Sequence, residues 1–231
     1  MKWNLEEKVK WTQEIINFEE KLIVAKKIAS FVKDGDVIGF GSGSTSYLAV
    51  LEIAKRIKNE NISIVAIPTS EEIRMVCSEE GIPTATINDF KPDWGFDGAD
   101  EVSDRNWLIK GRGGAMFNEK IIMANSEKTY IIVDRTKFVN KLCDKFPIPV
   151  ECFPGAYKSV VNSLRNLGAS RYELRAAGKS KDGPVITENG NYIVDVWFED
   201  VSENLEKKIK QIVGVIESGL FIGYNVEVVT M

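Results

Sequence analysis

Residues 37–57 read VIGFGSGSTSYLAVLEIAKRI. The run VIGFG is short and apolar, which is typical of a strand buried inside a parallel sheet. The turn after it is rich in glycine and hydroxyl side chains, and YLAVLEIAKRI then carries apolar residues at helical spacing. This stretch therefore predicts a strand, a tight turn and a helix, which together begin a βαβ unit.

The chain on either side of this stretch continues the alternation of helices and strands. The expected elements are a helix within 5–32, strands at 62–68, 84–87, 94–100 and 129–134, and helices at 71–80 and 118–126. Strands that alternate with helices are characteristic of a parallel sheet covered by helices. We therefore expect an α/β fold for this part of the chain.

The segment Phe146-Pro147-Ile148-Pro149 interrupts the alternation. The elements expected after it are helices at 156–168 and 202–214, an alternating strand at 191–199, and closing strands within 215–223 and 226–230. We expect a parallel-sheet catalytic domain formed by residues 1–145 and 215–231. Residues 146–214 are expected to form a smaller α+β subdomain.

The composition excludes several classes of protein. The 231 residues are 44% hydrophobic and 28% charged, values of an ordinary globular chain rather than a disordered or collagen-like one. The net charge of −4 lacks the basic surplus that binding to nucleic acid or an anionic membrane surface requires. Neither a membrane-spanning apolar run nor a signal-peptide core is evident, so we expect a cytoplasmic protein with no nucleic-acid or membrane partner.

The sequence contains no histidine. This excludes Ser-His-Asp and Cys-His nucleophile systems and every zinc site with a histidine ligand. A general base must then be Asp, Glu, Lys, Tyr or a thiolate. The cysteines at 77, 143 and 152 form no Cys-x-x-Cys pair, and we interpret them as buried, reduced thiols.

The turn Gly41-Ser42-Gly43-Ser44-Thr45 is a candidate anion site. Its glycines let the backbone approach a ligand, Ser44 and Thr45 offer hydroxyls, and the next helix presents free N–H groups. The turn matches neither a Walker A loop nor the full dinucleotide-binding pattern. A plain turn with a Ser/Thr cap is the alternative interpretation.

Two further clusters follow strands. Asp97, Asp100 and Glu101 bring three carboxylates together, and like charges raise one another's pKa. An acidic loop tip or a divalent-metal site is the alternative. In KGRGGAMFNEK (110–120), Lys110 could stabilise an oxyanion, and Glu119 lies in the first turns of the next helix. A flexible loop and a surface Glu–Lys pair are the alternatives there.

Taken together, the three clusters suit the movement of a proton beside a carbonyl in a phosphorylated substrate. The sequence also resembles type A ribose-5-phosphate isomerases from about Lys21 to Gly223. The motifs that carry this resemblance are GSGST (41–45), PTS (68–70), DGADEV (97–102), KGRGGA (110–115), NEKI (118–121), VDRTK (133–137), KFPIPVE (145–151) and ITENGNYIVDV (186–196).

The resemblance implies a Rossmann-like domain with a small α+β, ferredoxin-like subdomain, assembled as a homodimer or homotetramer. It implies interconversion of ribose 5-phosphate and ribulose 5-phosphate in the pentose phosphate pathway, through an enediol(ate), with no metal and no cofactor. Glu119 would be the general base, Asp97 would assist ring opening, and Asp100 and Lys110 would stabilise the enediolate oxygens. The implied substrate-binding residues are Lys21, Ser42, Gly43, Ser44, Thr45, Gly111, Arg112, Gly113 and Lys137.

The chain departs from the family pattern at three places. Ser42 stands where threonine is usual, Arg112 interrupts a glycine run, and about 20 residues precede Lys21. Three other interpretations stay open: a sugar-phosphate sensor that does not react, a coenzyme A transferase with a glutamate nucleophile, and an isomerase for a related aldose phosphate.

Overall fold

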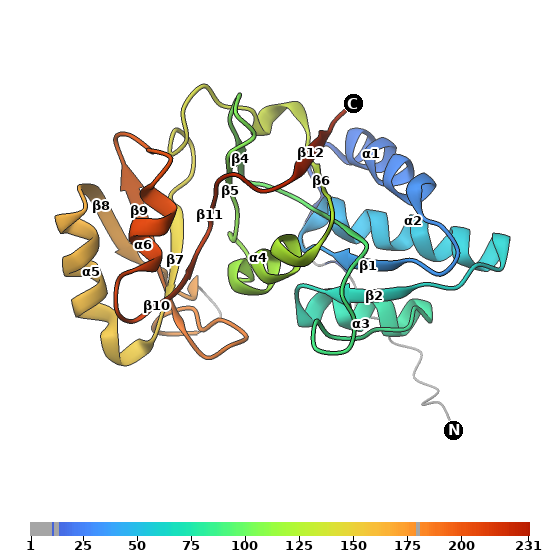
Figure 1. The fold of residues 1–231 in the computed structure, drawn as a ribbon, viewed down its shortest axis with the longest axis horizontal. Helices are drawn as coiled ribbons and strands as arrows, with labels where there is room; N and C mark the ends of the chain where they lie inside the picture. Colours follow the sequence, from blue (N-terminus) through green and yellow to red (C-terminus); the bar gives the residue numbers. More distant parts are fainter. Residues whose placement is uncertain (1–10, 12–13, 179–180) are drawn as a thin grey trace.

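A five-stranded parallel sheet forms the right half of the molecule as drawn in Figure 1. The structure is a computed structural model and describes residues 11, 14–178 and 181–231. The strand order is β12-β6-β3-β1-β2. The strands are β1 (Val37–Phe40), β2 (Val65–Pro68), β3 (Trp94–Asp97), β6 (Thr129–Ile132) and β12 (Val226–Val229). The predicted Rossmann-like sheet is thus confirmed.

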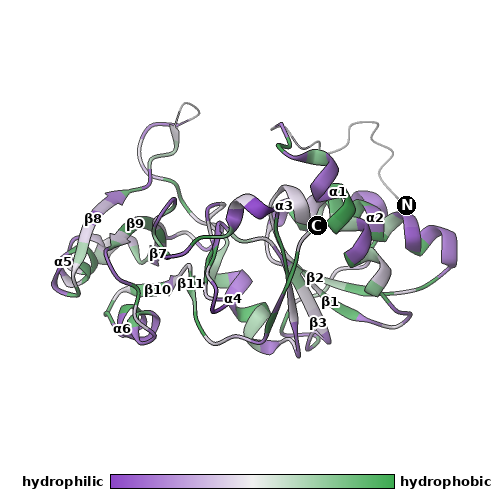
Figure 2. Cartoon of the chain, turned by 90° about the horizontal axis from the view of Figure 1, so that it is seen from above, coloured by the Kyte–Doolittle hydropathy of each residue, from purple (hydrophilic) through white to green (hydrophobic). Residues whose placement is uncertain are grey.

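Successive residues of β1 face opposite sides of this sheet. Ile38 and Phe40 pack into the core formed with α1 (Phe18–Phe31), α2 (Ser44–Glu60) and α3 (Glu71–Glu80). Gly39 faces the other side, where Ile122 of α4 (Met116–Asn125) lies against it. The helices carry both hydrophilic and hydrophobic residues, as expected of elements that bury one face (Figure 2). None of the described helices is both long and apolar enough to cross a bilayer.

A four-stranded antiparallel sheet forms the other half. Its elements run in the order β7 (Ile148–Cys152), α5 (Tyr157–Asn166), β8 (Ala169–Leu174), β9 (Tyr192–Phe198), α6 (Leu205–Lys210) and β10 (Val215–Ser218). The strand order β10-β7-β9-β8 is that of a ferredoxin-like βαββαβ unit, as predicted. Because β10 pairs with β7, residues 215–218 belong to this sheet. The division of the chain into two domains at residues 145 and 215 remains a prediction.

A small sheet connects the two halves. It consists of β4 (Glu101–Val102), β5 (Leu108–Ile109) and β11 (Leu220–Phe221), in the order β11-β5-β4. Helix α4 lies between the large sheets and packs against β3 on one side and against β7 and β10 on the other. Two short 3₁₀ helices, η1 (Arg135–Lys137) and η2 (Pro154–Ala156), complete the described elements.

Several sequence-based expectations were wrong in detail. Residues 84–87 form only an isolated bridge from Thr84 to Ala66, because Asp89 accepts the Thr86 N–H and turns the chain. The strands β7 and β8 were not expected, since β7 contains a proline and most of β8 is exposed. Helix α6 is shorter than 202–214. The expected first helix begins at Phe18, and most of its first half lies outside the described residues.

The strand order places a topological switch point between β1 and β3. Strand β1 connects through α2 to β2 on one side, whereas β3 lies on its other side. In open α/β sheets, ligands bind beyond the carboxyl ends of the strands at such a point. The edge where β1 and β3 end is therefore where a site is expected.

The close approach of α4 to the sheet depends on Gly39. A Cβ at this position would overlap the Ile122 side chain, so we expect Gly39→Ala to lower the free energy of unfolding by about 1–3 kcal/mol. Urea denaturation measures the change. Gly113→Ala is the control, because a Cβ there has no atom within 4 Å. Equal stability of the two variants would contradict this account of the packing.

Candidate active site

The carboxylate of Asp97 lies where β1 and β3 end. The backbone N–H groups of Ser42 and Gly98 donate to its Oδ1, over 3.1 and 2.7 Å. A Cβ on Gly41 would overlap the Asp97 carboxyl group, so only glycine lets the turn after β1 come this close. The glycine-rich turn and the acidic cluster therefore form one structure.

Lys110 lies at the centre of the candidate site. Its Nζ is 3.0 Å from Oδ2 of Asp97 and 3.5 Å from Oε2 of Glu119, and it donates to the carbonyl of Gly98. The side chain of Lys110 is only 2% exposed, that of Asp97 5% and that of Glu119 6%. The backbone fixes this lysine, because its N–H donates to the Gly219 carbonyl over 2.9 Å and β5 directly precedes it.

Glu119 lies in the first turn of α4, as predicted, and is buried. Its Oε2 accepts no hydrogen bond from the described residues. Burial raises the pKa of Glu119 to about 8, and the negative charges of Asp97 and Asp100 add to the effect while Lys110 opposes it. A carboxyl group of this kind can hold or release a proton near neutral pH.

The other two charged groups respond to the same burial. Burial raises the pKa of Asp97, although Lys110 opposes the shift. Burial alone would lower the pKa of Lys110, but its attraction to Asp97 and Glu119 outweighs this and raises it. The lysine is therefore an ammonium group at pH values near neutral, and its positive charge interacts favourably with both carboxylates.

Asp100 joins the site from the loop after β3. Its Oδ2 accepts the Arg112 N–H over 3.2 Å. Burial raises the pKa of Asp100, and the positive charges of Lys110 and Lys137 oppose this rise. Asp100 therefore lies within electrostatic reach of both lysines, between the glycine-rich loop and η1.

The beginning of α2 forms a second part of the site. Gly43 precedes the helix with φ of 88° and, as a glycine, has no side chain to cap the first N–H groups. The Lys21 Nζ donates to Ser44 Oγ over 3.0 Å. Burial lowers the pKa of Lys21, Asp134 opposes this, and Lys137 adds to it. Two lysines thus lie near an uncapped helix N-terminus, which is a favourable place for an anion.

The hydroxyl residues of this turn differ in their surroundings. Ser42 Oγ lies 2.6 Å from Thr69 Oγ1 at the end of β2, and Ser44 is held by Lys21. Thr45 is buried in the first turn of α2. The PTS motif at 68–70 therefore supports the glycine-rich turn directly, a contact that the sequence did not predict.

The loop from Gly111 to Gly114 lies along the edge of the site. Gly111 adopts φ of 90°, which favours glycine. Arg112 is exposed, with its guanidinium carbon 5.4 Å from the centroid of the Phe146 ring, and Lys137 Nζ lies 5.2 Å from the same centroid. Gly113 is exposed in open space. The structure thus brings Arg112 and Lys137 to the same aromatic ring.

Sequence reasoning missed two residues that support the site. Arg175 Nη1 donates to the carbonyls of Gly111 and Arg112, over 3.1 and 2.8 Å, while its Nε donates to Asp195. Asn118 Nδ2 donates to the Thr69 carbonyl over 3.1 Å. No local sequence signal indicates the Arg175 contact, because this arginine lies far along the chain in the antiparallel half.

The acidic cluster does not form a metal site among the described residues, where no group of three or more Asp, Glu or Cys side chains is placed to hold an ion. Instead, the Lys110 ammonium lies between the carboxylates of Asp97 and Glu119. The side chains present are therefore those of an acid–base site.

The fold and the site define an α/β enzyme with a buried lysine among carboxylates at the edge of a parallel sheet. The model of the family described as "Ribose 5-phosphate isomerase A (phosphoriboisomerase A)" matches residues 65–231. The ribose-5-phosphate isomerase A of Methanocaldococcus jannaschii is 44% identical over 207 residues, which cover 89% of this chain and 91% of that protein. The chain therefore belongs to the ribose-5-phosphate isomerase A family, and the resemblance seen in the sequence is confirmed.

Solved structures agree with this assignment. The M. jannaschii ribose 5-phosphate isomerase A superposes with a TM-score of 0.88 at 44% identity and covers 92% of this chain and 95% of that one. A D-ribose-5-phosphate isomerase in complex with phospho-erythronic acid has a TM-score of 0.87 at 40% identity, with coverage of 91 and 94%. The architecture is therefore shared with these proteins over 91–92% of the chain.

The raised pKa of Glu119 has a consequence for stability. Between its ordinary value of 4.5 and about 8, the folded protein holds a proton that the unfolded chain has lost, so this group makes folding less favourable as pH rises. Glu119→Gln cannot ionise. We expect the difference in free energy of unfolding, variant minus wild type, to become more positive between pH 5 and pH 9, as measured by urea titrations. A difference that is constant or shrinks would contradict the raised pKa.

Proposed function

We propose that this protein interconverts D-ribose 5-phosphate and D-ribulose 5-phosphate through an enediol(ate), as a step of the pentose phosphate pathway. The observation that carries the proposal is the buried group in which Lys110 Nζ lies within 3.0 Å of Asp97 and 3.5 Å of Glu119. Isomerisation requires a base that takes a proton from one carbon and returns it to the next, and a cation beside the oxygen that becomes negative.

The proposed roles follow from the positions of the side chains. Glu119, whose Oε2 accepts no hydrogen bond from the described residues, takes the C2 proton and delivers it to C1. Lys110 and Asp100 face the two oxygens of the enediolate, and the ammonium stabilises the developing charge. Asp97, held by two backbone N–H groups, assists ring opening. General base catalysis and a preorganised cation contribute rate factors of roughly 10²–10⁴ and 10²–10³.

We further propose that the phosphate binds at the beginning of α2. Ser42, Gly43, Ser44 and Thr45 supply N–H and hydroxyl groups there, and Lys21 supplies a charge. Lys137 adds a second charge from η1, and the loop Gly111-Arg112-Gly113 covers the sugar. A bound phosphate remote from the reacting carbons helps to fix the reactive geometry.

The ligand of the structurally similar isomerase supports this arrangement. That protein is described as a complex with phospho-erythronic acid, which carries a phosphate and a carboxylate. In this chain the phosphate would bind at the start of α2, and the carboxylate would bind beside the Lys110 ammonium. A carboxylate in this position resembles the charge distribution of an enediolate, so the acid is a suitable probe of the site.

The role of Glu119 is tested by Glu119→Gln. The amide keeps the shape of the side chain but cannot accept the proton, so we expect kcat to fall by about 10²–10⁴-fold while the affinity for phospho-erythronic acid stays within about threefold. An assay of ribulose 5-phosphate formation and calorimetric titration measure the two quantities. The control is Glu127→Gln, whose side chain is exposed. Full activity of Glu119→Gln would remove Glu119 from this role.

A substrate panel tests the reaction itself. With ribose 5-phosphate, arabinose 5-phosphate and glucose 6-phosphate, each measured with and without excess EDTA, we expect ribose 5-phosphate to give the highest kcat/KM. We expect chelation to change that value by less than about twofold, since an ammonium supplies the positive charge. Preference for another aldose phosphate would change the substrate but keep the chemistry. Loss of activity in EDTA would contradict the proposed mechanism.

We also propose that the protein is a cytoplasmic homodimer or homotetramer. The three cysteines are unpaired, which suits a reducing compartment. The family resemblance supports an oligomer, and analytical ultracentrifugation of the purified chain would establish its size.

A further inference from the structure

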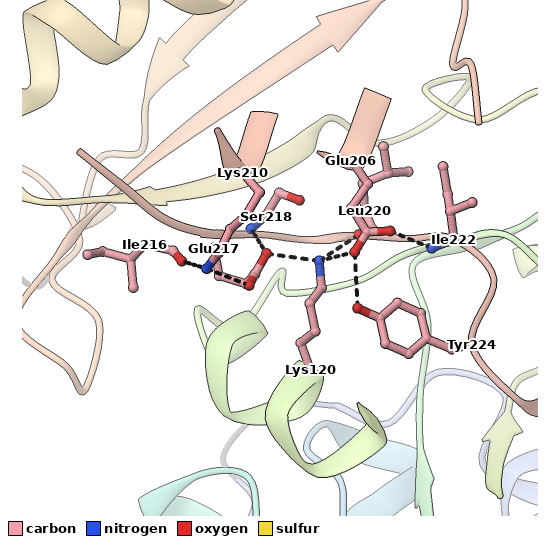
Figure 3. A network of polar contacts seen from close by, with 9 residues as sticks. All are labelled: Lys120, Glu206, Lys210, Ile216, Glu217, Ser218, Leu220, Ile222 and Tyr224. Atoms are coloured by element: carbon pink, nitrogen blue, oxygen red, sulfur yellow. Dashed lines mark hydrogen bonds and ion pairs between the residues drawn. The ribbon is translucent and has the colours of Figure 1, made fainter. Parts of the chain in front are cut away.

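Lys120 follows Glu119 directly on α4 but enters a separate, buried network (Figure 3). Its Nζ donates to Glu206 Oε1 over 2.6 Å, to Glu217 Oε1 over 3.1 Å and to the Leu220 carbonyl over 2.8 Å. The side chains of Lys120, Glu206 and Glu217 are 7, 12 and 11% exposed. Consecutive residues on a helix do not face the same way, so α4 presents Glu119 to the site and Lys120 elsewhere.

The partners of Lys120 come from three different elements. Glu206 lies on α6, Glu217 on β10, and Leu220 on β11. One ammonium group thus ties α4 to the antiparallel half of the molecule and to the small connecting sheet. Strand β11 pairs with β5, whose last residue, Ile109, directly precedes Lys110.

Both carboxylates of the network are themselves held in place. Glu206 also accepts the Ile222 N–H over 2.8 Å and the Tyr224 hydroxyl over 3.2 Å. Glu217 also accepts its neighbouring Ser218 N–H and the Lys210 ammonium, each over 2.9 Å. A fully hydrogen-bonded buried network of this kind specifies one arrangement of the elements that meet in it.

Phe221 links this network to the candidate active site. Its ring is 1% exposed, with Lys120 Nζ 4.6 Å and Lys110 Nζ 5.8 Å from the ring centroid. The two buried ammonium groups therefore pack on the same aromatic side chain. A shift of α4 away from β11 would change the surroundings of Lys110 as well as the position of Glu119.

We propose that Lys120 is a positioning residue for the isomerase reaction, which fixes α4 so that the Glu119 carboxylate stays beside Lys110 and the substrate carbon. The inference rests on the proposed function. Lys120 acts through the helix, since its ammonium is engaged by Glu206, Glu217 and Leu220. Misplacement of a catalytic group by about 1 Å can cost about 10²-fold in rate, so a residue behind the helix can affect turnover.

The chain offers a matched pair of variants. Both lysines form an ion pair with Glu217. Lys120→Met removes the pair made by α4, whereas Lys210→Met removes the pair made by α6, where the lysine side chain is 48% exposed. For Lys120→Met we expect kcat for ribose 5-phosphate to fall by about 10–100-fold with KM within about threefold. For Lys210→Met we expect both constants to stay within about twofold.

A pH profile separates positioning from general destabilisation. The charged groups that face Glu119 are Lys110, Asp97 and Asp100. Burial raises the pKa of this glutamate, and the attraction of Lys110 opposes the rise. A displacement of Glu119 changes its burial, its attraction to Lys110 and its repulsion from Asp97 and Asp100 together, so we expect the acidic limb of kcat/KM to move to a different pH in Lys120→Met. A lysine with only a structural role would lower the folded fraction and leave the limb in place.

The outcomes distinguish this inference from the function on which it rests. Wild-type protein without isomerase activity would overturn both. Active wild type with equal kcat and equal pH limbs in Lys120→Met and Lys210→Met would overturn the positioning role alone. If thermal melting shows that Lys120→Met does not fold, Glu217→Gln decides in its place: a lower kcat than Lys210→Met with KM unchanged supports the role, and matching kinetics overturn it.

Discussion

The burial of one ammonium group among carboxylates is the constraint on which this site depends. Lys110 is 2% exposed and has Asp97 and Glu119 on either side. A lone cation at this depth would be very costly, and so would either carboxylate without it. With more carboxylates than cations in the group, one carboxyl group keeps its proton to higher pH. That part falls to Glu119, because its Oε2 lies 3.5 Å from Lys110 Nζ, whereas Asp97 lies 3.0 Å away and also accepts two backbone N–H groups.

The fold supplies this arrangement from three directions. Strand β3 ends on Asp97, Lys110 directly follows β5 of the connecting sheet, and Glu119 lies in the first turn of α4. Gly41 lets the glycine-rich turn after β1 approach Asp97, and Gly39 lets α4 approach the sheet on its other face. Each glycine is thus required by a contact with a neighbouring element.

Part of the site could be predicted from the sequence, because the turn at Ser42 and the cluster at Asp97 follow two parallel strands, β1 and β3, that are neighbours in one sheet. The carboxyl ends of such strands meet at one edge, so these two clusters had to lie together. Lys110 follows β5 of the small antiparallel sheet, and its place beside them was predicted from the family resemblance and not from this rule. The supporting contacts could not be predicted. Arg175 and Glu206 reach the site or its helix from the antiparallel half, and nothing in their local sequence indicates those partners. Strand β8 was missed for a related reason, since most of its residues are exposed and lack an apolar alternation.

We expect Glu119 to exchange its proton near neutral pH. Carbon-13 NMR of protein labelled at the glutamate side-chain carboxyls, titrated from pH 4 to pH 10, tests it directly. One glutamate signal should titrate at about 8 and be missing from the spectrum of Glu119→Gln. An ordinary pKa of about 4.3 for every glutamate signal of the wild-type protein would contradict a proton on Glu119 near neutral pH.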